Sequence, residues 1–214
     1  YNLTVEDDMS LKGKVTYLKG DYAALDFRNY YESFNSDEAY LTAFKSGKKG
    51  LKILSHKIDN LDSIYKPIIE EFEFTATNSV SNIDGELYIM PLVFEQLKEN
   101  PFQVVSREYP IDFGYAREKT IIVNYTIPQG YSVTKLTEDA SMKLPGNTAF
   151  FIRKTTVTDN KVTITYKFNI NKSLFPPAEY SDLREFYNQI ITKQADPIVL
   201  KKIWNDLTFY LLIL

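Results

Sequence analysis

A strict alternation of apolar and polar residues constrains the fold of this chain more than any other feature. It is clearest in the segment 161–170, where five apolar residues occupy every second position: Val162, Ile164, Tyr166, Phe168 and Ile170. A period of two is typical of a β-strand with one buried face and one solvated face. A second strand is predicted at 149–157, and Asp159-Asn160 between the two tolerate the positive φ of a type I′ turn. The pattern therefore predicts an antiparallel hairpin.

The residues on either side of this hairpin extend the β pattern and then end it. Residues 121–127 also alternate, and the turn signal Pro128-Gln129-Gly130 leads into a further strand at 131–136. Pro176-Pro177 ends the β region, because neither residue can donate a ladder hydrogen bond. A helix is predicted from there to about Lys193, and its apolar positions form one stripe: Leu183, Phe186, Tyr187, Ile190 and Ile191. We expect this helix to lie against a sheet or to cap the end of a sandwich.

The N-terminal part mixes strand and helix signals. Strands are predicted at 11–17, 51–58, 68–76 and, after the turn signal Asp84-Gly85, at 86–90. Two helices are predicted before residue 50, the first from Asp21 and the second from Asn35 or Ser36 to Gly47. The first is expected to bury Ala23, Phe27, Tyr30, Tyr31 and Phe34, and the second Ala39, Tyr40, Ala43 and Phe44.

These elements together predict an α+β fold that is mainly β. We expect antiparallel, β-sandwich-like sheets with a few helices, including a C-terminal helix. No strand leads into a Gly-rich phosphate loop, which argues against a doubly wound fold. The predicted boundary lies near residues 91–101. It divides the chain into a strand/helix α+β subdomain at 1–92 and an antiparallel β-sandwich-like domain with the C-terminal helix at 93–214.

Composition excludes several kinds of chemistry. The 214 residues contain no cysteine, so disulfides, thiolate metal sites and a cysteine nucleophile are absent. The net charge is −3, whereas nucleic-acid-binding proteins usually carry an excess or a cluster of basic residues. No nucleic-acid partner is therefore expected. No Gly-x-Ser-x-Gly nucleophile elbow occurs. The acidic run Glu6-Asp7-Asp8 lacks the ligand spacing of a calcium loop, and we expect neither a metal site nor a cofactor.

Acid–base catalysis is not predicted either. His56 is the only histidine, and we expect it to face solvent on its strand rather than to act as a base. Three carboxylate pairs could in principle cleave glycosidic bonds: Asp7 with Asp8, Asp21 with Asp26, and Glu70 with Glu71. None of them is set in an apolar frame that would raise one pKa. The sequence thus predicts no catalytic residues.

Aromatic residues are the richest resource of the chain, which has 16 Tyr, 14 Phe and one Trp. Exposed tyrosines can stack on sugars or peptides, although such residues more often fill cores. Tyr109, Phe113 and Tyr115 are therefore a candidate binding surface for a glycan or a peptide. An exposed flat patch at these positions would favour binding, and a buried cluster would favour packing.

The two ends of the chain allow further expectations. The chain starts at Tyr1 without a signal-peptide pattern, which indicates a fragment or a processed product. The apolar tail 207–214 is far shorter than the roughly 20 residues that span a bilayer, so no membrane span is expected. Such a β-prone segment tends to be covered. We expect it to pack on its own chain or to mediate self-association through Ile203–Leu214, with Trp204 as an anchor.

Two stretches carry a resemblance to a known family. They are Asn100-Pro101-Phe102 leading to Tyr109-Pro110-Ile111-Asp112-Phe113-Gly114-Tyr115, and Asn171-Lys172-Ser173-Leu174-Phe175-Pro176-Pro177-Ala178-Glu179-Tyr180. The chain resembles the C-terminal module, a domain of unknown function, of bacterial transglutaminase-like proteins, chiefly from Bacteroidetes. The similarity runs from about Gly20 to Lys202. Residues 203–214 extend beyond the point where the family usually stops.

The resemblance implies a role outside the catalytic core. In such proteins a papain-type Cys-His-Asp core lies upstream of the module, and none of its catalytic residues maps onto this chain. The implied protein is an exported, periplasmic or cell-surface protein of the cysteine-peptidase fold. The implied role is a non-catalytic structural and interaction module that docks on the upstream domain. A glycan- or peptide-binding module is the alternative, and an autonomous hydrolase is the weakest candidate.

Overall fold

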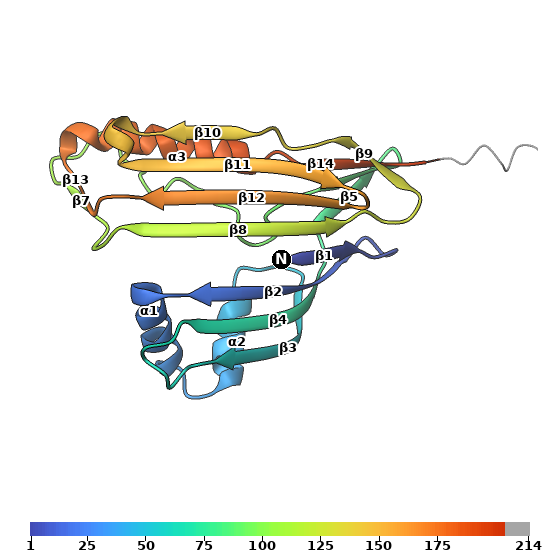
Figure 1. Cartoon of the computed structure of the whole chain (residues 1–214), viewed down its shortest axis with the longest axis horizontal. Helices are drawn as coiled ribbons and strands as arrows, with labels where there is room; N and C mark the ends of the chain where they lie inside the picture. Colours follow the sequence, from blue (N-terminus) through green and yellow to red (C-terminus); the bar gives the residue numbers. More distant parts are fainter. Residues whose placement is uncertain (204–214) are drawn as a thin grey trace, which may run out of the picture. The chain divides into compact units, whose positions relative to one another are not determined.

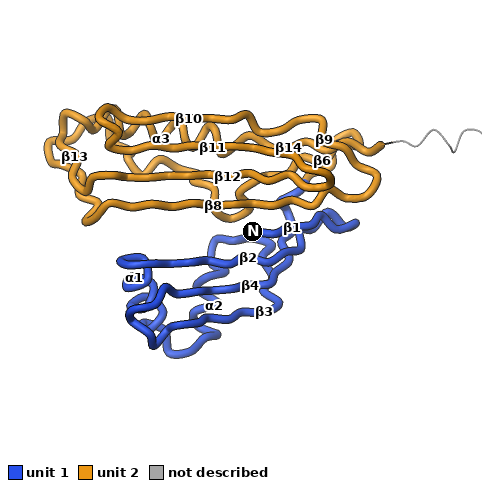
Figure 2. Tube along the Cα trace, in the orientation of Figure 1, with its two compact units in different colours: residues 1–80 blue, residues 81–214 orange. Residues whose placement is uncertain are grey.

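The computed structural model describes residues 1–203, which form two compact units. Unit 1 comprises residues 1–80 and unit 2 begins at residue 81 (Figure 2). The domain boundary expected near residues 91–101 stays a prediction. The expectation for the tail from Trp204 onward, including its role as an anchor, lies outside the described residues.

Unit 1 is an antiparallel sheet accompanied by two helices (Figure 1). Its strands follow the order β1-β2-β4-β3, and all three pairings are antiparallel. The elements are β1 (Asn2–Val5), β2 (Leu11–Lys19), α1 (Asp21–Glu32), α2 (Asp37–Lys45), β3 (Leu51–Asp59) and β4 (Ile68–Ala76). The predicted strands and helices are confirmed, whereas β1 was not predicted.

The buried side of α1 differs from the predicted stripe. Ala24, Phe27 and Arg28 are buried, whereas Ala23 and Tyr30 are exposed, so the prediction was wrong for those two positions. The stripe is rotated because the helix buries a charged residue at position 28. In α2 the expected Ser36 cap is present, and its hydroxyl accepts a hydrogen bond from the backbone N–H of Ala39 at 3.2 Å.

Burial in α2 is also narrower than predicted. Tyr40 is buried, and Ala43 and Phe44 are half-buried, but Ala39 is exposed. Ala39 lies in the first turn, one residue away from the face that carries Tyr40. The helix therefore contacts the sheet mainly through its aromatic side chains, and Phe44 stacks on Phe72 of β4 with ring centroids 4.4 Å apart.

Arg28 organises the loop between β3 and β4. Its guanidinium donates hydrogen bonds of 2.8–3.0 Å to four backbone carbonyls: those of Asn60, Leu61, Ser63 and Lys66. These bonds come from Nε and Nη2, and they offset part of the cost of removing the guanidinium from water. One helix side chain thus fixes the path of this connection.

Unit 2 contains most of the β structure. Four of its strands are neighbours in the order β10-β11-β12-β8, a separate four-stranded sheet has the order β5-β6-β14-β9, and β13 pairs with β7. Its strands are β5 (Val80–Ile83), β6 (Glu86–Ile89), β7 (Ile111–Asp112), β8 (Arg117–Thr126), β9 (Tyr131–Lys135), β10 (Ala140–Lys143), β11 (Ala149–Thr158), β12 (Lys161–Ile170), β13 (Leu174–Phe175) and β14 (Ile198–Lys202). Its helices are α3 (Tyr180–Gln194) and the 3-10 turns at Pro145–Asn147 and Pro177–Glu179.

The predicted hairpin is confirmed as β11 and β12. The two strands pair antiparallel from Ala149↔Ile170 to Thr158↔Lys161, which leaves Asp159-Asn160 as the turn. Asp159 has a positive φ of 51°, but Asn160 does not, so the turn departs from the type I′ pattern. At the Asp84-Gly85 turn, in contrast, both residues have positive φ, as the tight β5–β6 connection requires.

The predicted core face of β12 is confirmed at four of its five positions. Val162, Ile164, Tyr166 and Ile170 are buried, whereas Phe168 is half-buried. Helix α3 lies behind β10 and β11 in Figure 1 and packs on this face. Phe168 stacks on Phe186 of α3 with ring centroids 6.1 Å apart. The fold class is thus as predicted, mainly β with antiparallel sheets and a C-terminal helix.

Among the described residues of unit 2, Arg153 is the largest side chain that is completely buried. It donates hydrogen bonds to the carbonyl of Glu138 at 2.7 Å, to the carbonyl of Lys193 and to the carboxylate of Asp196 at 2.9 Å. Lys193 is in the last turn of α3, where carbonyl groups lack helical partners. The guanidinium therefore joins β11 to the segment before β10 and to the C-terminal end of α3.

None of the helices within residues 1–203 is both long and apolar enough to cross a membrane.

Candidate functional site

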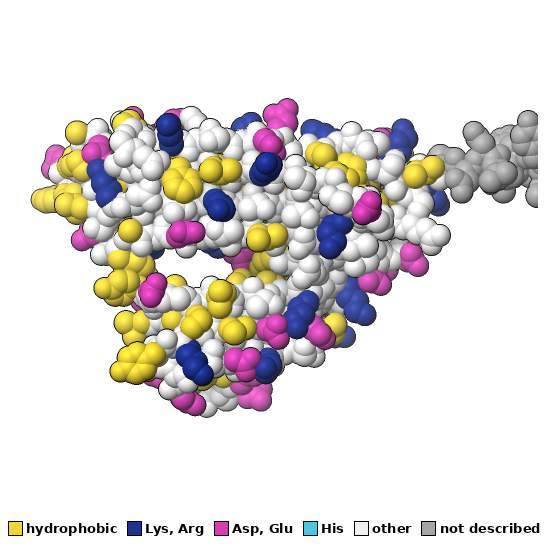
Figure 3. Space-filling view, in the orientation of Figure 1, with side chains coloured by type: hydrophobic (Ala, Val, Ile, Leu, Met, Phe, Trp, Pro, Cys, Tyr) yellow, Lys and Arg dark blue, Asp and Glu magenta, His cyan; other side chains and the backbone are white. Residues whose placement is uncertain are grey.

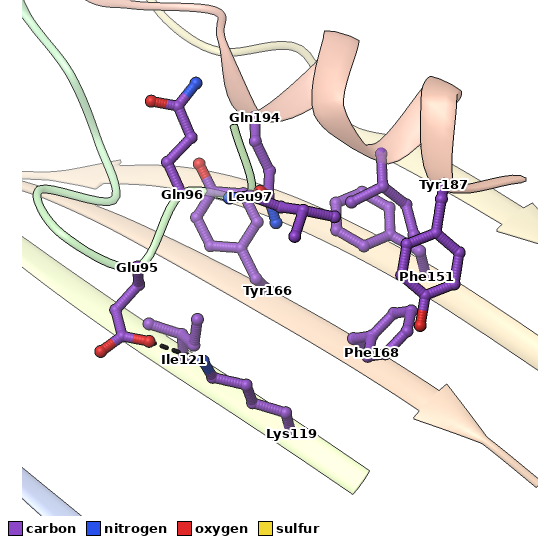
Figure 4. Close-up of a pocket in the computed structure, with 11 residues that line it drawn as sticks. Glu95, Gln96, Leu97, Lys119, Ile121, Phe151, Tyr166, Phe168, Tyr187 and Gln194 are labelled. Carbon is purple, nitrogen blue, oxygen red and sulfur yellow. Dashed lines mark hydrogen bonds and ion pairs between the residues drawn. The ribbon is translucent and has the colours of Figure 1, made fainter. Parts of the chain in front are cut away.

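Unit 2 contains a cavity of about 290 Å³ (Figure 4). Strands β8, β11 and β12 form one side, α3 forms another, and the segment 95–97 forms a third. The lining residues are Glu95, Gln96, Leu97, Lys119, Ile121, Phe151, Tyr166, Phe168, Tyr187, Ile190 and Gln194. A concave, mainly apolar pocket with a few polar groups is the usual form of a small-molecule site.

Local sequence periodicity brings these side chains together. Tyr166 and Phe168 are two residues apart on β12 and share one face, which the cross-strand partners Phe151 and Ile121 extend. On α3, Tyr187, Ile190 and Gln194 follow helical spacing and lie on one side of the helix. The cavity is therefore a space between the predicted apolar faces of the sheet and the helix.

Gln194 holds the third wall in place. Its side-chain Oε1 accepts a hydrogen bond from the backbone N–H of Leu97 at 2.8 Å. This contact fixes an otherwise irregular segment against α3. At the rim, Lys119 of β8 forms an ion pair with Glu95 at 2.6 Å, drawn as a dashed line in Figure 4. The two rim charges neutralise each other.

The Tyr166 hydroxyl is the unusual group of this region. It is buried, and no hydrogen bond of normal geometry joins it to any residue within the described chain. Burial raises the pKa of Tyr166 to about 12, although the positive charge of Arg153 and a close contact from its guanidinium, short of a hydrogen bond of normal geometry, oppose part of this shift. The hydroxyl is thus neutral and retains unused hydrogen-bonding capacity beside the cavity.

Unit 1 holds a separate polar cluster, and it overturns the expectation for His56. The His56 side chain is only 5% exposed, so the prediction that it faces solvent was wrong. Its ring stacks on Phe72 with centroids 4.5 Å apart, and Tyr40 lies on the same side of the sheet at 5.6 Å. Helix α2 covers this part of the strand, which the sequence pattern of β3 alone does not indicate.

Glu70 is the centre of that cluster. It is 1% exposed, a burial that the sequence pattern did not indicate. Its carboxylate accepts hydrogen bonds from Tyr40 and, at 2.6 Å, from Lys19, and it lies 3.1 Å from Nε2 of His56. Its neighbour Glu71 points to the other face, where it pairs with Lys14 at 3.1 Å. The two carboxylates are therefore on opposite faces and cannot act together.

The position of His56 between two carboxylates determines its protonation. Nδ1 lies 3.1 Å from Asp37, and Nε2 faces Glu70. Carboxylate oxygens only accept hydrogen bonds, so both ring nitrogens must carry protons to donate to both partners. Burial lowers the pKa of His56, but the hydrogen bonds and charges of Glu70 and Asp37 outweigh it and raise the pKa overall. Burial raises the pKa of Glu70, whereas His56, Lys19 and Tyr40 lower it overall.

This cluster gives a pH-dependent stability. The folded-state pKa of His56 lies above its unfolded value of about 6.5, so its contribution is complete below that pH and is lost as pH rises through the folded pKa. We expect the difference in unfolding free energy between the wild type and His56→Gln to be larger at pH 5.5 than at pH 8.5. Urea denaturation at both pH values measures it.

A neighbouring substitution provides the control. Lys57→Gln removes an exposed charge next to His56 in sequence, and its effect on stability should be small at both pH values. A wild-type advantage over His56→Gln that grew with pH would contradict the doubly protonated state.

The predicted aromatic surface is only partly assembled. Tyr109 is 76% exposed. Phe113 is half-buried and contacts the ring edges of Phe102 and Phe175, and the Arg117 guanidinium lies over the rings of both Phe113 and Tyr115. Binding of a glycan or a peptide at these residues stays a prediction.

The charged residues are dispersed. In Figure 3, basic and acidic side chains are scattered among each other over the visible face of unit 2. Within residues 1–203, no group of three or more His, Asp or Glu side chains is arranged to hold a metal ion.

Some cavity residues lie on faces that the sequence predicts, and others do not. Tyr166, Phe168, Tyr187 and Ile190 belong to predicted apolar faces, whereas Lys119, Gln194 and the segment 95–97 carried no signal. The buried partners Arg28, Glu70 and Arg153 were also missed, since a charged residue in an amphipathic pattern indicates solvent.

Comparison with known proteins relates this chain to a family of unknown function. A family model described as "Domain of Unknown Function with solved-structure structure (DUF3858)" matches residues 85–200, more than half of the chain. The crystal structure of a "putative protease" from Parabacteroides distasonis is similar at 17% identity with a TM-score of 0.45. That alignment covers 56% of this chain and 24% of that protein, so the chain spans less than a quarter of its length. No curated protein matches the chain.

Proposed function

This chain belongs to the DUF3858 family, and from that premise we propose that it is a non-catalytic structural and interaction module of an exported transglutaminase-like protein. The observation that carries the proposal is the absence of cysteine from all 214 residues. A papain-type enzyme needs a thiolate nucleophile activated by a histidine. The catalytic core then lies in another part of the parent protein.

The environment of His56 supports the same conclusion. Both of its ring nitrogens face carboxylates, and its side chain is almost completely buried. A general base has to reach a substrate proton directly or through one water molecule. His56 serves instead to hold α2 against β3 and β4.

The partner and the location follow from the motif resemblance. The motif-bearing stretches around Asp112 and Pro176 meet in unit 2, where β7 pairs with β13. We propose that the module docks on an upstream transglutaminase-like domain, in the periplasm or at the cell surface, and that residues 203–214 contribute to self-association.

An activity assay tests the non-catalytic assignment. The purified chain is incubated with fluorescently labelled casein for proteolysis, and with casein and a fluorescent amine for transglutamination. We expect rates equal to the buffer blank, because no activated nucleophile is present. Turnover that copurifies with the chain and disappears in His56→Gln would contradict the proposal.

The parent gene tests the interaction role separately. We expect the coding sequence upstream of Tyr1 to encode a Cys-His-Asp core, and the two polypeptides, expressed separately, to form a complex in light scattering. An upstream sequence without such a core would remove the basis for the proposed partner.

A glycan- or peptide-binding module is the second candidate, which the exposure of Tyr109 favours. Here Tyr109→Ala should weaken binding of an oligosaccharide or peptide library member at least tenfold, whereas docking to an upstream domain would not require that residue. Ile203, another exposed apolar side chain, provides a comparison position in this binding experiment.

A further inference from the structure

We propose that the cavity of unit 2 binds a neutral small molecule with two fused rings and one hydrogen-bonding group. This inference concerns unit 2 alone and does not depend on the proposed interaction role. Its first basis is size. An apolar cavity of about 150 Å³ is sufficient for benzene, and this cavity is about twice as large. It therefore has room for a second ring.

The walls define the body of the ligand. Ile121 and Ile190 present aliphatic carbon, and Phe151 and Phe168 present rings from the sheet. Aromatic rings favour offset or edge-to-face contacts with another ring. In Figure 4, Phe168 and Tyr187 lie at one end of the cavity and Tyr166 and Gln194 at the other. The carbon-rich end would receive the rings of the ligand.

The charged residues of the lining indicate that the ligand carries no net charge. Lys119 and Glu95 are the charged residues of the lining, and they are paired with each other at the rim. An ionised group carried into the cavity would lose its hydration and find no uncompensated opposite charge. The site therefore favours a neutral molecule over an anion of the same shape.

The polar end provides the hydrogen bond. The Tyr166 hydroxyl is buried without a hydrogen bond from the described residues. Gln194 reaches from α3 towards it (Figure 4), and because its Oε1 accepts from Leu97, its Nε2 is the group that can donate. A hydroxyl or carbonyl oxygen on the ligand would accept from the Tyr166 hydroxyl, with Gln194 Nε2 as a second donor. Leaving a buried polar group unpaired is costly, so such a ligand gains specificity there.

The experiment uses 2-naphthol as the probe and 2-naphthoate as its anionic counterpart. Both are titrated into the 15N-labelled chain at neutral pH, and amide shifts are followed by NMR. We expect 2-naphthol to bind with a dissociation constant on the order of 0.1–1 mM, typical of a ligand with so few atoms. 2-Naphthoate should bind at least about tenfold more weakly. No saturable shifts with 2-naphthol, or equal affinity for the anion, would overturn the proposal.

Matched variants locate the probe. Ile121→Trp fills the cavity and should weaken 2-naphthol binding at least about tenfold. Ile152→Trp makes the same change on an exposed position of β11 and should leave it unchanged. Tyr166→Phe keeps the ring and should weaken binding about three- to tenfold through the lost hydroxyl. Unchanged affinity in Tyr166→Phe would overturn the assigned polar contact even if Ile121→Trp failed to fold.

Discussion

Replacing Arg153 with alanine is expected to lower the free energy of unfolding by about 3–5 kcal/mol, measured by urea denaturation. The side chain is completely buried, and its guanidinium is the donor for the carbonyls of Glu138 and Lys193. The substitution leaves both acceptors without this donor and leaves a space in the core of unit 2. We therefore expect the loss to exceed that of an ordinary core truncation of the same size.

The partner carboxylate separates the ion pair from the carbonyl contacts. Asp196→Asn keeps an oxygen that can accept from the guanidinium, but it leaves the buried Arg153 charge without its carboxylate partner. It should cost less than Arg153→Ala, which also loses the bonds to the two carbonyls and the packing of the side chain. If Asp196→Asn were as destabilising as Arg153→Ala, the ion pair and not the carbonyl bonding would be the main contribution of Arg153.

Replacing Tyr166 with alanine should also cost about 3–5 kcal/mol, whereas Tyr166→Phe should cost nothing or stabilise by up to about 1 kcal/mol. The ring is buried between β11 and β8, but its hydroxyl has no hydrogen bond from the described residues. Removing the ring thus loses packing, while removing the oxygen loses a desolvated polar group. Thermal and urea unfolding of the two variants measures the difference.

Phe168→Ala is the comparison within the same strand. Phe168 is half-buried because it lines the cavity, so its truncation should cost less than that of Tyr166. A cost for Tyr166→Phe as large as for Tyr166→Ala would show that the hydroxyl has a partner in solution.

The elements could be predicted from sequence because each depends on local periodicity. The segment 161–170 and the stripe from Leu183 to Ile190 each bury one face, and the chain pattern specifies that face directly. The short strands β1 and β14 could not be predicted in this way. Strand β1 has only four residues, and β14 pairs with a strand far along the chain, as in the pairing of Leu200 with Leu87.

The polar interior was missed for a related reason. A charged residue in a strand or helix indicates a solvated position unless its partners are known. The partners of Glu70 are on β2, α2 and β3, and those of Arg28 are in the loop after β3. Only the tertiary structure brings these groups together. The cavity, too, depends on how closely α3 and the segment 95–97 approach the sheet, which no pattern in the chain specifies.

Because Arg28 binds only backbone carbonyls of its loop, the path of the loop depends little on which side chains the loop carries. The guanidinium binds four carbonyl oxygens, which every amino acid possesses, and Asn60 closes the loop by donating to the carbonyl of Pro67. Ile64 and Tyr65 at its tip are exposed and contribute nothing to that frame. Residues 61–65 can therefore diverge during evolution, or be exchanged for a foreign peptide in engineering, while the path of the main chain is preserved. The position that mutation cannot alter freely is in the preceding helix, more than thirty residues away.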